Sequence, residues 1–339
     1  MKFRKLTALF LSVIFLGLAL AGCTGGDDGG KTTTAPNNGV TTNQTSGKAE
    51  YAIILKTLSN DFWATMKEGI EAQASELGVK VDIFAAQSEE DTAGQLTILE
   101  NCLTKGYKAI GVAPLSPTNL INGIVQANEK NIYVMNIDEK IDLETLKGAG
   151  GSVIGFATTD NEAVGEKGAK FIINQLGDDG GDVAIIEGKA GNASGESRKA
   201  GATKAFKAAD DIDLVASQPA DWDRQKALDT ATSYIQMYPE LKAIYCCNDT
   251  MALGALQAVI NANKLGKIIV VGTDGSAEAL DSIKAGQLSA TVAQDPAEIG
   301  ATSLREMVDA VKENAKIDPN ATPQTIPVDS YVVTKDNVK

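Results

Sequence analysis

From residue 50 onward, short apolar runs alternate with longer stretches in which apolar residues recur at helical spacing. The first apolar run is "YAIIL" at 51–55, and a helical pattern follows it at 61–77. Near-continuous apolar runs are typical of strands buried on both faces, and strands that alternate with helices indicate parallel sheets. The repeats are too numerous for a single sheet, so the predicted fold class is α/β, with two doubly wound parallel-sheet lobes.

The pattern predicts the remaining elements as follows. Further strands are expected at 79–85, 109–114, 132–137, 153–159, 183–187, 213–217, 243–247, 268–272 and 290–293. Further helices are expected at 90–105, 117–130, 161–176, 196–209, 224–237, 249–263, 276–285 and 297–313. The segment 139–152 is predicted to link the two series.

The first 22 residues have the pattern of a signal sequence. Three basic residues near the start precede an apolar run at 6–21, which is too short and wrongly flanked for a membrane-spanning helix. The run ends in "LAGC" at 20–23, which resembles the bacterial lipobox, and this resemblance implies a lipid on Cys23. Ordinary secretion with an incidental Cys23 is the alternative. Residues 23–49 are rich in Gly, Thr, Asn and Ser, and we expect a flexible tether there.

Composition and charge remove several classes of function. The 339 residues carry a net charge of −13 and contain no histidine. An acidic chain without a basic cluster is a poor candidate for binding nucleic acid or anionic membrane surfaces. Without histidine, neither a Ser-His-Asp triad nor a His-ligated zinc site can form. Cys102, Cys246 and Cys247 show no metal-binding spacing, and we expect buried thiols and no metal or cofactor.

Polar and aromatic side chains collect directly after the predicted strands, where doubly wound sheets bind ligands. The first such stretch is "KTLSNDFW" at 56–63. Amides and carboxylates can pair with hydroxyl groups, and flat aromatic faces can cover a sugar ring. No phosphate-binding pattern lies at a strand–helix turn, so a neutral sugar is the predicted ligand. The candidate binding residues are Lys56, Asn60, Phe62, Trp63, Asp138, Glu139, Asn192, Glu196, Arg198, Trp222, Asn248, Asp274 and Gln294.

Each of these residues also has a purely structural interpretation. Asn60, or Ser59 before it, could cap the helix that follows. Phe62 and Trp63 flank an apolar helical stripe and could belong to the core. Asp138, Asn248 and Asp274 could be turn residues, and Trp222 could be a loop anchor.

Several segments carry a resemblance to a known family. They include "YAIILKTLSNDFW" (51–63), "NIDEKID" (136–142), "AIYCCNDTMALG" (243–254), "VVGTDG" (270–275) and "TVAQDPAEIGAT" (291–302). The chain from about 50 to 334 resembles the periplasmic ribose-binding family of ABC-transporter receptors, and it looks closest to the D-allose-binding members. The resemblance implies two similar lobes of the type I periplasmic binding protein fold, joined by three segments. The first lobe would comprise 50–158 plus 295–324, and the second 159–294 plus 325–339.

The resemblance also implies roles for individual residues. Asn60, Asp138, Asn248, Asp274 and Gln294 match positions that hold sugar hydroxyls. Phe62, Trp63 and Trp222 match aromatic residues that stack on the sugar ring. Glu196 or Arg198 falls near a binding arginine, with the alignment ambiguous, and Asn192 is a lesser candidate in the same segment.

Three positions depart from the ribose receptors of the family. Lys56 stands where these have serine, Glu139 where an arginine follows the matching aspartate, and Thr273 where they have phenylalanine. The segments around Lys56 and Glu139 instead look like those of the allose-binding members, which favours a hexose over ribose.

The expected function is that of an extracytoplasmic, lipid-anchored, monomeric receptor without enzymatic activity. It would bind D-allose or a related hexose, close over it and deliver it to the permease of an ABC importer. D-ribose, D-psicose or another monosaccharide is the alternative ligand. A glycosidase using Asp138 or Glu139 with Asp274 would need two carboxylates at a defined separation, which nothing in the sequence indicates.

Overall fold

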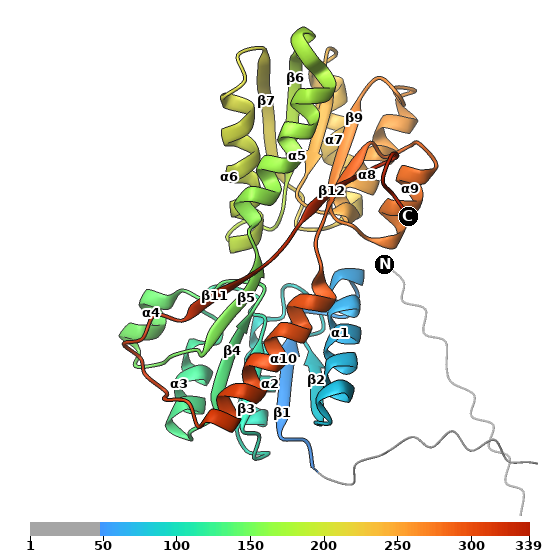
Figure 1. The fold of residues 1–339 in the computed structure, drawn as a ribbon. Coiled ribbons are helices and arrows are strands. Elements are labelled where there is room, and N and C mark those ends of the chain that lie inside the picture. Colours follow the sequence, from blue (N-terminus) through green and yellow to red (C-terminus); the bar gives the residue numbers. More distant parts are fainter. Residues whose placement is uncertain (1–47) are drawn as a thin grey trace, which may run out of the picture. The chain divides into compact units, whose positions relative to one another are not determined.

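The computed structural model describes residues 48–339 (Figure 1). The predicted signal sequence at 1–22, Cys23 and most of the predicted tether lie outside the described residues. Within the described part of the chain, no helix combines the length and the apolar character needed to cross a membrane.

The first lobe is built on a parallel six-stranded sheet in the order β11-β5-β4-β3-β1-β2. Its strands are β1 (Tyr51–Leu55), β2 (Val81–Ala85), β3 (Ala109–Val112), β4 (Tyr133–Ile137), β5 (Gly155–Thr159) and β11 (Gln324–Val328). Its helices are α1 (Asp61–Leu77), α2 (Thr92–Cys102), α3 (Ile121–Glu129), α4 (Leu143–Gly148) and α10 (Pro296–Glu313).

The second lobe contains a six-stranded sheet in the order β12-β10-β9-β8-β6-β7, in which β12 runs antiparallel to β10. Its strands are β6 (Gly181–Glu187), β7 (Ile212–Pro219), β8 (Ala243–Cys246), β9 (Ile269–Asp274), β10 (Ala290–Ala293) and β12 (Tyr331–Thr334). Its helices are α5 (Asn161–Leu176), the 3₁₀ turn η1 (Gly177–Asp179), α6 (Ala193–Lys207), α7 (Arg224–Met237), α8 (Asp249–Asn261) and α9 (Ala277–Lys284).

Burial on both faces explains why the central strands are apolar throughout. All five residues of β1 are buried, and their side chains alternate between two core clusters. Ile53 and Leu55 join the cluster that contains α1 and α10, while Ala52 and Ile54 join the cluster that contains α2 and α3. Full burial of each large aliphatic side chain contributes about 1.5 to 3 kcal/mol to folding. The edge strands β2 and β7 are only half-buried and carry more polar residues.

Two α/β lobes joined by three crossovers are confirmed, with one boundary corrected. The chain crosses between the lobes after β5, after β10 and between β11 and β12 (Figure 1). The predicted boundary at 324/325 is wrong, because β11 pairs with β5 along Gln324–Val328 and belongs to the first sheet. The segment 139–152 also contains the short helix α4, which begins at the cap Asp142.

Two helices of the second lobe, α5 and α6, pack with their backbones in close contact. A Cβ atom at Gly165 would lie 1.9 Å from the carbonyl oxygen of Arg198, and one at Gly201 would lie 2.0 Å from that of Glu162. The two glycines therefore allow an approach that no larger residue permits. This packing fixes the turn of α6 that carries Arg198.

We expect Gly165→Ala to destabilise the protein by about 1 to 3 kcal/mol, because the added methyl group overlaps backbone atoms that have no freedom to move aside. Chemical denaturation of the purified protein measures this. Gly148→Ala is the control, since no atom lies within 4 Å of a Cβ at that helical position. Equal stability of the two variants would contradict the packing argument.

Candidate ligand-binding site

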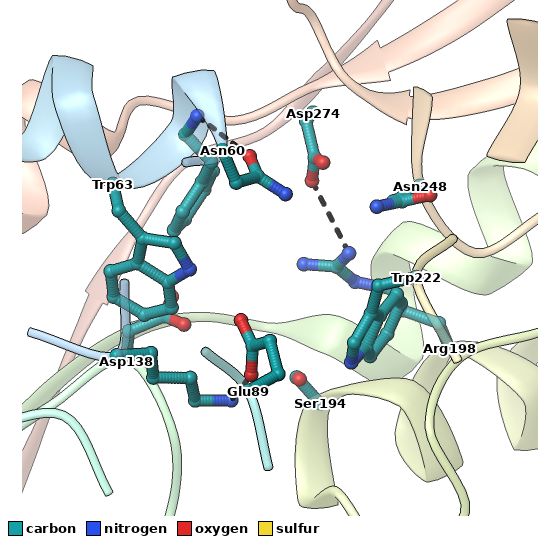
Figure 2. Close-up of a pocket in the computed structure, with 11 residues that line it drawn as sticks. Asn60, Trp63, Glu89, Asp138, Ser194, Arg198, Trp222, Asn248 and Asp274 are labelled. Atoms are coloured by element: carbon teal, nitrogen blue, oxygen red, sulfur yellow. Dashed lines mark hydrogen bonds and ion pairs between the residues drawn. The ribbon is translucent and has the colours of Figure 1, made fainter. Parts of the chain in front are cut away.

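A pocket lies at the carboxyl ends of the strands of both sheets, between the two lobes (Figure 2). The space between its side chains, including the part open to solvent, is about 360 Å³. Eleven residues line it, nine of which are among the predicted candidates: Lys56, Asn60, Phe62, Trp63, Glu89, Asp138, Ser194, Arg198, Trp222, Asn248 and Asp274.

Aromatic rings form two walls of the pocket. Trp63, in the first turn of α1, is 4% exposed and packs into the core of the first lobe. Its ring meets that of Phe62 edge to face, with ring centroids 5.1 Å apart. Trp222 belongs to the second lobe, and its ring lies over Gly188 and Gly195, where any Cβ atom would come within 3 Å of it. Trp63 and Trp222 appear on opposite sides of the pocket in Figure 2. Core packing and pocket lining are therefore combined in these residues.

Two asparagines place amide groups at helix N-termini beside the pocket. The side-chain oxygen of Asn60 accepts from the N–H of Phe62 at 2.9 Å and caps α1. The oxygen of Asn248 accepts from the N–H of Met251 at 2.9 Å and caps α8. In Figure 2 the amide nitrogens of both asparagines point into the pocket. Each cap thus leaves two N–H donors for a ligand.

Two aspartates occupy corresponding places in the lobes, directly after β4 and at the end of β9. Both have positive φ, at 58° for Asp138 and 119° for Asp274. Asp274 accepts from Gln294 at 2.7 Å and from Arg198 at 3.3 Å. The Oδ1 atom of Asp138 is buried, and no partner for it occurs among the described residues. A buried acceptor without a partner costs free energy, so Asp138 marks a place where a ligand donor would be stabilising.

Burial also changes the acidity of these carboxyl groups. It raises the pKa of Asp138 to about 7, although the nearby Lys56 ammonium opposes the change. Burial raises the pKa of Asp274 as well, against the opposing charge of Arg198. Perturbed carboxyl groups in a cleft are typical of functional sites, because the protein alone does not compensate their burial.

Lys56 is the buried cation of the first lobe. Its Nζ atom lies 2.8 Å from Glu139, 3.9 Å from Glu89 and 5.7 Å from the centroid of the Trp63 ring. Burial alone would lower the pKa of Lys56, but the charges of Glu139 and Glu89 outweigh it and the pKa is raised. The lysine therefore stays charged and can donate hydrogen bonds into the pocket.

Four of the predicted residues are not among the side chains that line the pocket. Glu139 is fully buried and holds Lys56, and Asn192 bonds to Trp222 at 3.0 Å. Gln294 points its amide nitrogen at Asp274. Glu196 contacts Lys199 and the N–H of Gly191, so of the two candidates Glu196 and Arg198 it is Arg198 that lines the pocket.

Glu89 and Ser194 line the pocket and were not predicted. Glu89 follows β2 in "QSEED" (87–91), so the strand-end argument would have found it if applied to the second strand. Ser194 lies in the first turn of α6, within a segment already noted, and its hydroxyl group donates to Glu139 at 2.7 Å.

Comparison with known proteins assigns the chain to a family. A model of the periplasmic binding protein domain matches residues 51–315. The D-allose-binding periplasmic protein of Escherichia coli is 60% identical over 85% of this chain and 92% of its own length. The ribose import binding protein of Bacillus subtilis is 35% identical over 80% of this chain and 84% of its own length.

Solved structures give the same assignment. A periplasmic solute-binding protein of an ABC transporter from Actinobacillus succinogenes, solved with bound D-allose, superposes with a TM-score of 0.80 at 32% identity. The match covers 86% of this chain and 99% of that one. The family model, the close relative and the shared fold together show that the chain belongs to the periplasmic binding proteins.

Proposed function

We propose that the protein is an extracytoplasmic receptor that binds D-allose or a closely related hexose and delivers it to an ABC importer. The observation that carries this proposal is the pocket, in which Trp63 and Trp222 lie on opposite sides. Side chains from both lobes that can pair with hydroxyl groups line the rest of it. The proposal is supported by the relative named for D-allose binding and by the solved neighbour that holds D-allose. The family consists of binding proteins, so the chain is a receptor and not an enzyme.

The groups around the pocket suit a neutral polyol. A sugar hydroxyl both donates and accepts, so it pairs best where donors and acceptors alternate. Asp138 and Asp274 would accept hydroxyl protons, while the amides of Asn60 and Asn248 and the Arg198 guanidinium would donate to hydroxyl oxygens. The tryptophan faces would cover the apolar faces of the ring. Only a form with the lobes together makes all these contacts, so binding would favour it.

Lys56, the buried cation of the first lobe, favours a hexose over ribose as the ligand. Lys56 and its partner Glu139 depart from the ribose receptors of the family, and they form a buried pair at the pocket wall. The identity of 60% to the D-allose-binding relative, against 35% to a ribose-binding one, points the same way. D-ribose and D-psicose remain the ligands to test beside D-allose.

We further propose that the mature protein is a monomer held at the outer face of the membrane by a lipid on Cys23. The "LAGC" sequence at 20–23 and the polar segment that follows support an anchor and a tether.

Sugar binding is tested by calorimetry with D-allose, D-psicose, D-ribose, D-xylose, D-glucose and D-galactose. We expect D-allose to bind most tightly. Alanine at Asp138, Asn248 or Asp274 should weaken binding about 10- to 100-fold, because ligand hydroxyls or buried protein groups lose their partners. Asp142→Ala, which removes an exposed helix cap on α4, is the matched control. Unchanged affinity in all three variants would refute the site, and no binding of any sugar would refute the function.

Asp138→Asn should stabilise the sugar-free protein at pH 8 by about 1 to 3 kcal/mol while weakening sugar binding. The folded state raises the pKa of Asp138 from 3.8 to about 7, so its stability contribution is fully present below pH 4 and lost as the pH rises through 7. The stability advantage of the variant over the wild type should therefore develop between pH 4 and 7. Chemical unfolding of both proteins at several pH values measures it. Asp142→Asn is the control, since a backbone hydrogen bond lowers the pKa of Asp142. A pH-independent difference would contradict this assignment.

Cys23→Ala should release the protein from the membrane fraction into the soluble fraction of its host cells, because a cysteine is required to carry the lipid. Detergent-phase partitioning of the wild type and the variant measures this. Membrane association that survives the substitution would rule out the proposed anchor.

A further inference from the structure

One segment of the second lobe, residues 189–194, reaches across to the first lobe at three places, and we call it the latch segment. Lys189 donates to the carbonyl oxygen of Glu89 at 2.6 Å. Asn192 donates to the carbonyl oxygen of Leu115 at 3.0 Å. Ser194 donates its N–H at 3.0 Å and its hydroxyl at 2.7 Å to Glu139. Among the described residues, the side-chain hydrogen bonds between the lobes come from this segment, apart from those at the crossovers.

Two residues that take part in these interlobe bonds, Glu139 and Asn192, also bind a side chain that lines the pocket. Glu139 accepts from Ser194 of the second lobe and also from Lys56 of its own lobe, at 2.8 Å. Asn192 donates to Leu115 of the first lobe and accepts from the indole N–H of Trp222 at 3.0 Å. The Glu139 carboxylate and the Asn192 amide therefore each contact the other lobe and each hold a pocket side chain, Lys56 or Trp222.

Neither group is available to the ligand. Both oxygens of Glu139 are engaged, and its side chain is 0% exposed. Asn192 uses its oxygen for Trp222 and its nitrogen for Leu115, and it is 2% exposed. Both residues lie behind the side chains that line the pocket.

A second hollow lies between the start of α1 and the region of α8 and α9, and the crossover residues Gln294, Asp295 and Pro296 also line it. It shares Asn60, Phe62 and Asp274 with the ligand pocket. The latch segment thus joins the lobes beside the part of the pocket lined by Ser194, while the second hollow adjoins the part lined by Asn60, Phe62 and Asp274.

We propose that Glu139 and Asn192 are positioning residues that couple contact between the lobes to the placement of Lys56 and Trp222. The inference rests on the proposed sugar-receptor function, and it assigns these two residues to closure and not to sugar contact. When the lobes separate, Glu139 loses Ser194 and Asn192 loses Leu115. The bonds therefore stabilise the closed form regardless of which sugar it holds, and they should slow dissociation of every ligand by a similar factor.

The test uses Asn192→Asp, which keeps an acceptor for Trp222 but cannot donate to the carbonyl group of Leu115. We expect the dissociation rates of D-allose and of a weaker sugar from the panel to rise by the same factor, about tenfold, in stopped-flow measurements. Glu139→Gln should also raise both rates, because the neutral amide holds Ser194 less strongly, but it loosens the pocket residue Lys56 as well, so equal factors are expected only of Asn192→Asp. A pocket variant, Asn248→Ala, should instead change the ratio between the two sugars.

The matched control is Asn128→Asp. Asn128 also joins two backbone groups, accepting from Ser152 at 2.7 Å and donating to Ile132 at 3.3 Å, but both lie in the first lobe. It should lower stability and leave sugar dissociation unchanged. Factors that differ between sugars in Asn192→Asp, or unchanged rates in both latch variants, would overturn the proposal.

A second measurement separates this proposal from the proposed function. Fluorescent labels on the two lobes report the interlobe distance without sugar. We expect both latch variants to shift the distribution toward longer distances, and Asn128→Asp to leave it unchanged. If the wild type binds no sugar of the panel, the proposed function fails, while this distance still decides the latch: a shift supports it, and no shift refutes it.

Discussion

The buried ion pair between Lys56 and Glu139 joins two strand ends of the first lobe to a helix of the second. Lys56 follows β1, Glu139 follows β4, and Ser194 adds the first turn of α6 from the second lobe. Two charges removed from water are stable only if each is paired and hydrogen-bonded, and loss of one partner from such a pair costs about 3 to 5 kcal/mol. The pair therefore constrains two strand ends and one helix start at once. It also holds Lys56 beside Trp63, and both side chains line the pocket.

Asp138 shows the opposite condition, because the protein does not fully compensate the burial of its carboxyl group with hydrogen bonds. Asp138 combines a left-handed backbone, a buried carboxyl group and an oxygen without a partner among the described residues. A left-handed conformation of a residue other than glycine is itself a source of strain, and such strain concentrates at functional sites. The hydroxyl group of Thr158 donates to the carbonyl oxygen of Asp138 at 2.8 Å and so fixes the backbone there. The side chain of Asp138 therefore stays directed at the pocket. The unpartnered carboxyl oxygen costs free energy in the sugar-free protein. A ligand hydroxyl that donates to this oxygen would remove that cost, which favours binding here.

The sequence allowed the fold to be predicted because the central strands are buried on both faces and leave continuous apolar runs. It was less informative at the sheet edges, where "QTIPV" of β11 and "YVVT" of β12 are largely half-buried or exposed and give no such run. The strand-end argument located the pocket but not the direction of each side chain. Glu139 and Asn192 lie at predicted positions, yet their partners Ser194 and Leu115 come from the other lobe and leave no local signal. The structural and functional interpretations of Asn60 were not alternatives, since one amide oxygen caps α1 while the nitrogen faces the pocket.

Charge sets a further limit on the ligand. Asp138, Asp274 and Glu89 line the pocket, and only Lys56 and Arg198 oppose them. Lys56 is already engaged by Glu139, and Arg198 is held by Asp274, Asn161 and the carbonyl oxygen of Cys247. Both cations are thus neutralised by protein groups at close range. A phosphorylated sugar would bring negative charge to a site with no free counter-charge among its lining residues, and at low dielectric that repulsion would outweigh several hydrogen bonds. The charges that line the pocket therefore favour a neutral sugar over a phosphorylated one as the ligand of the proposed receptor.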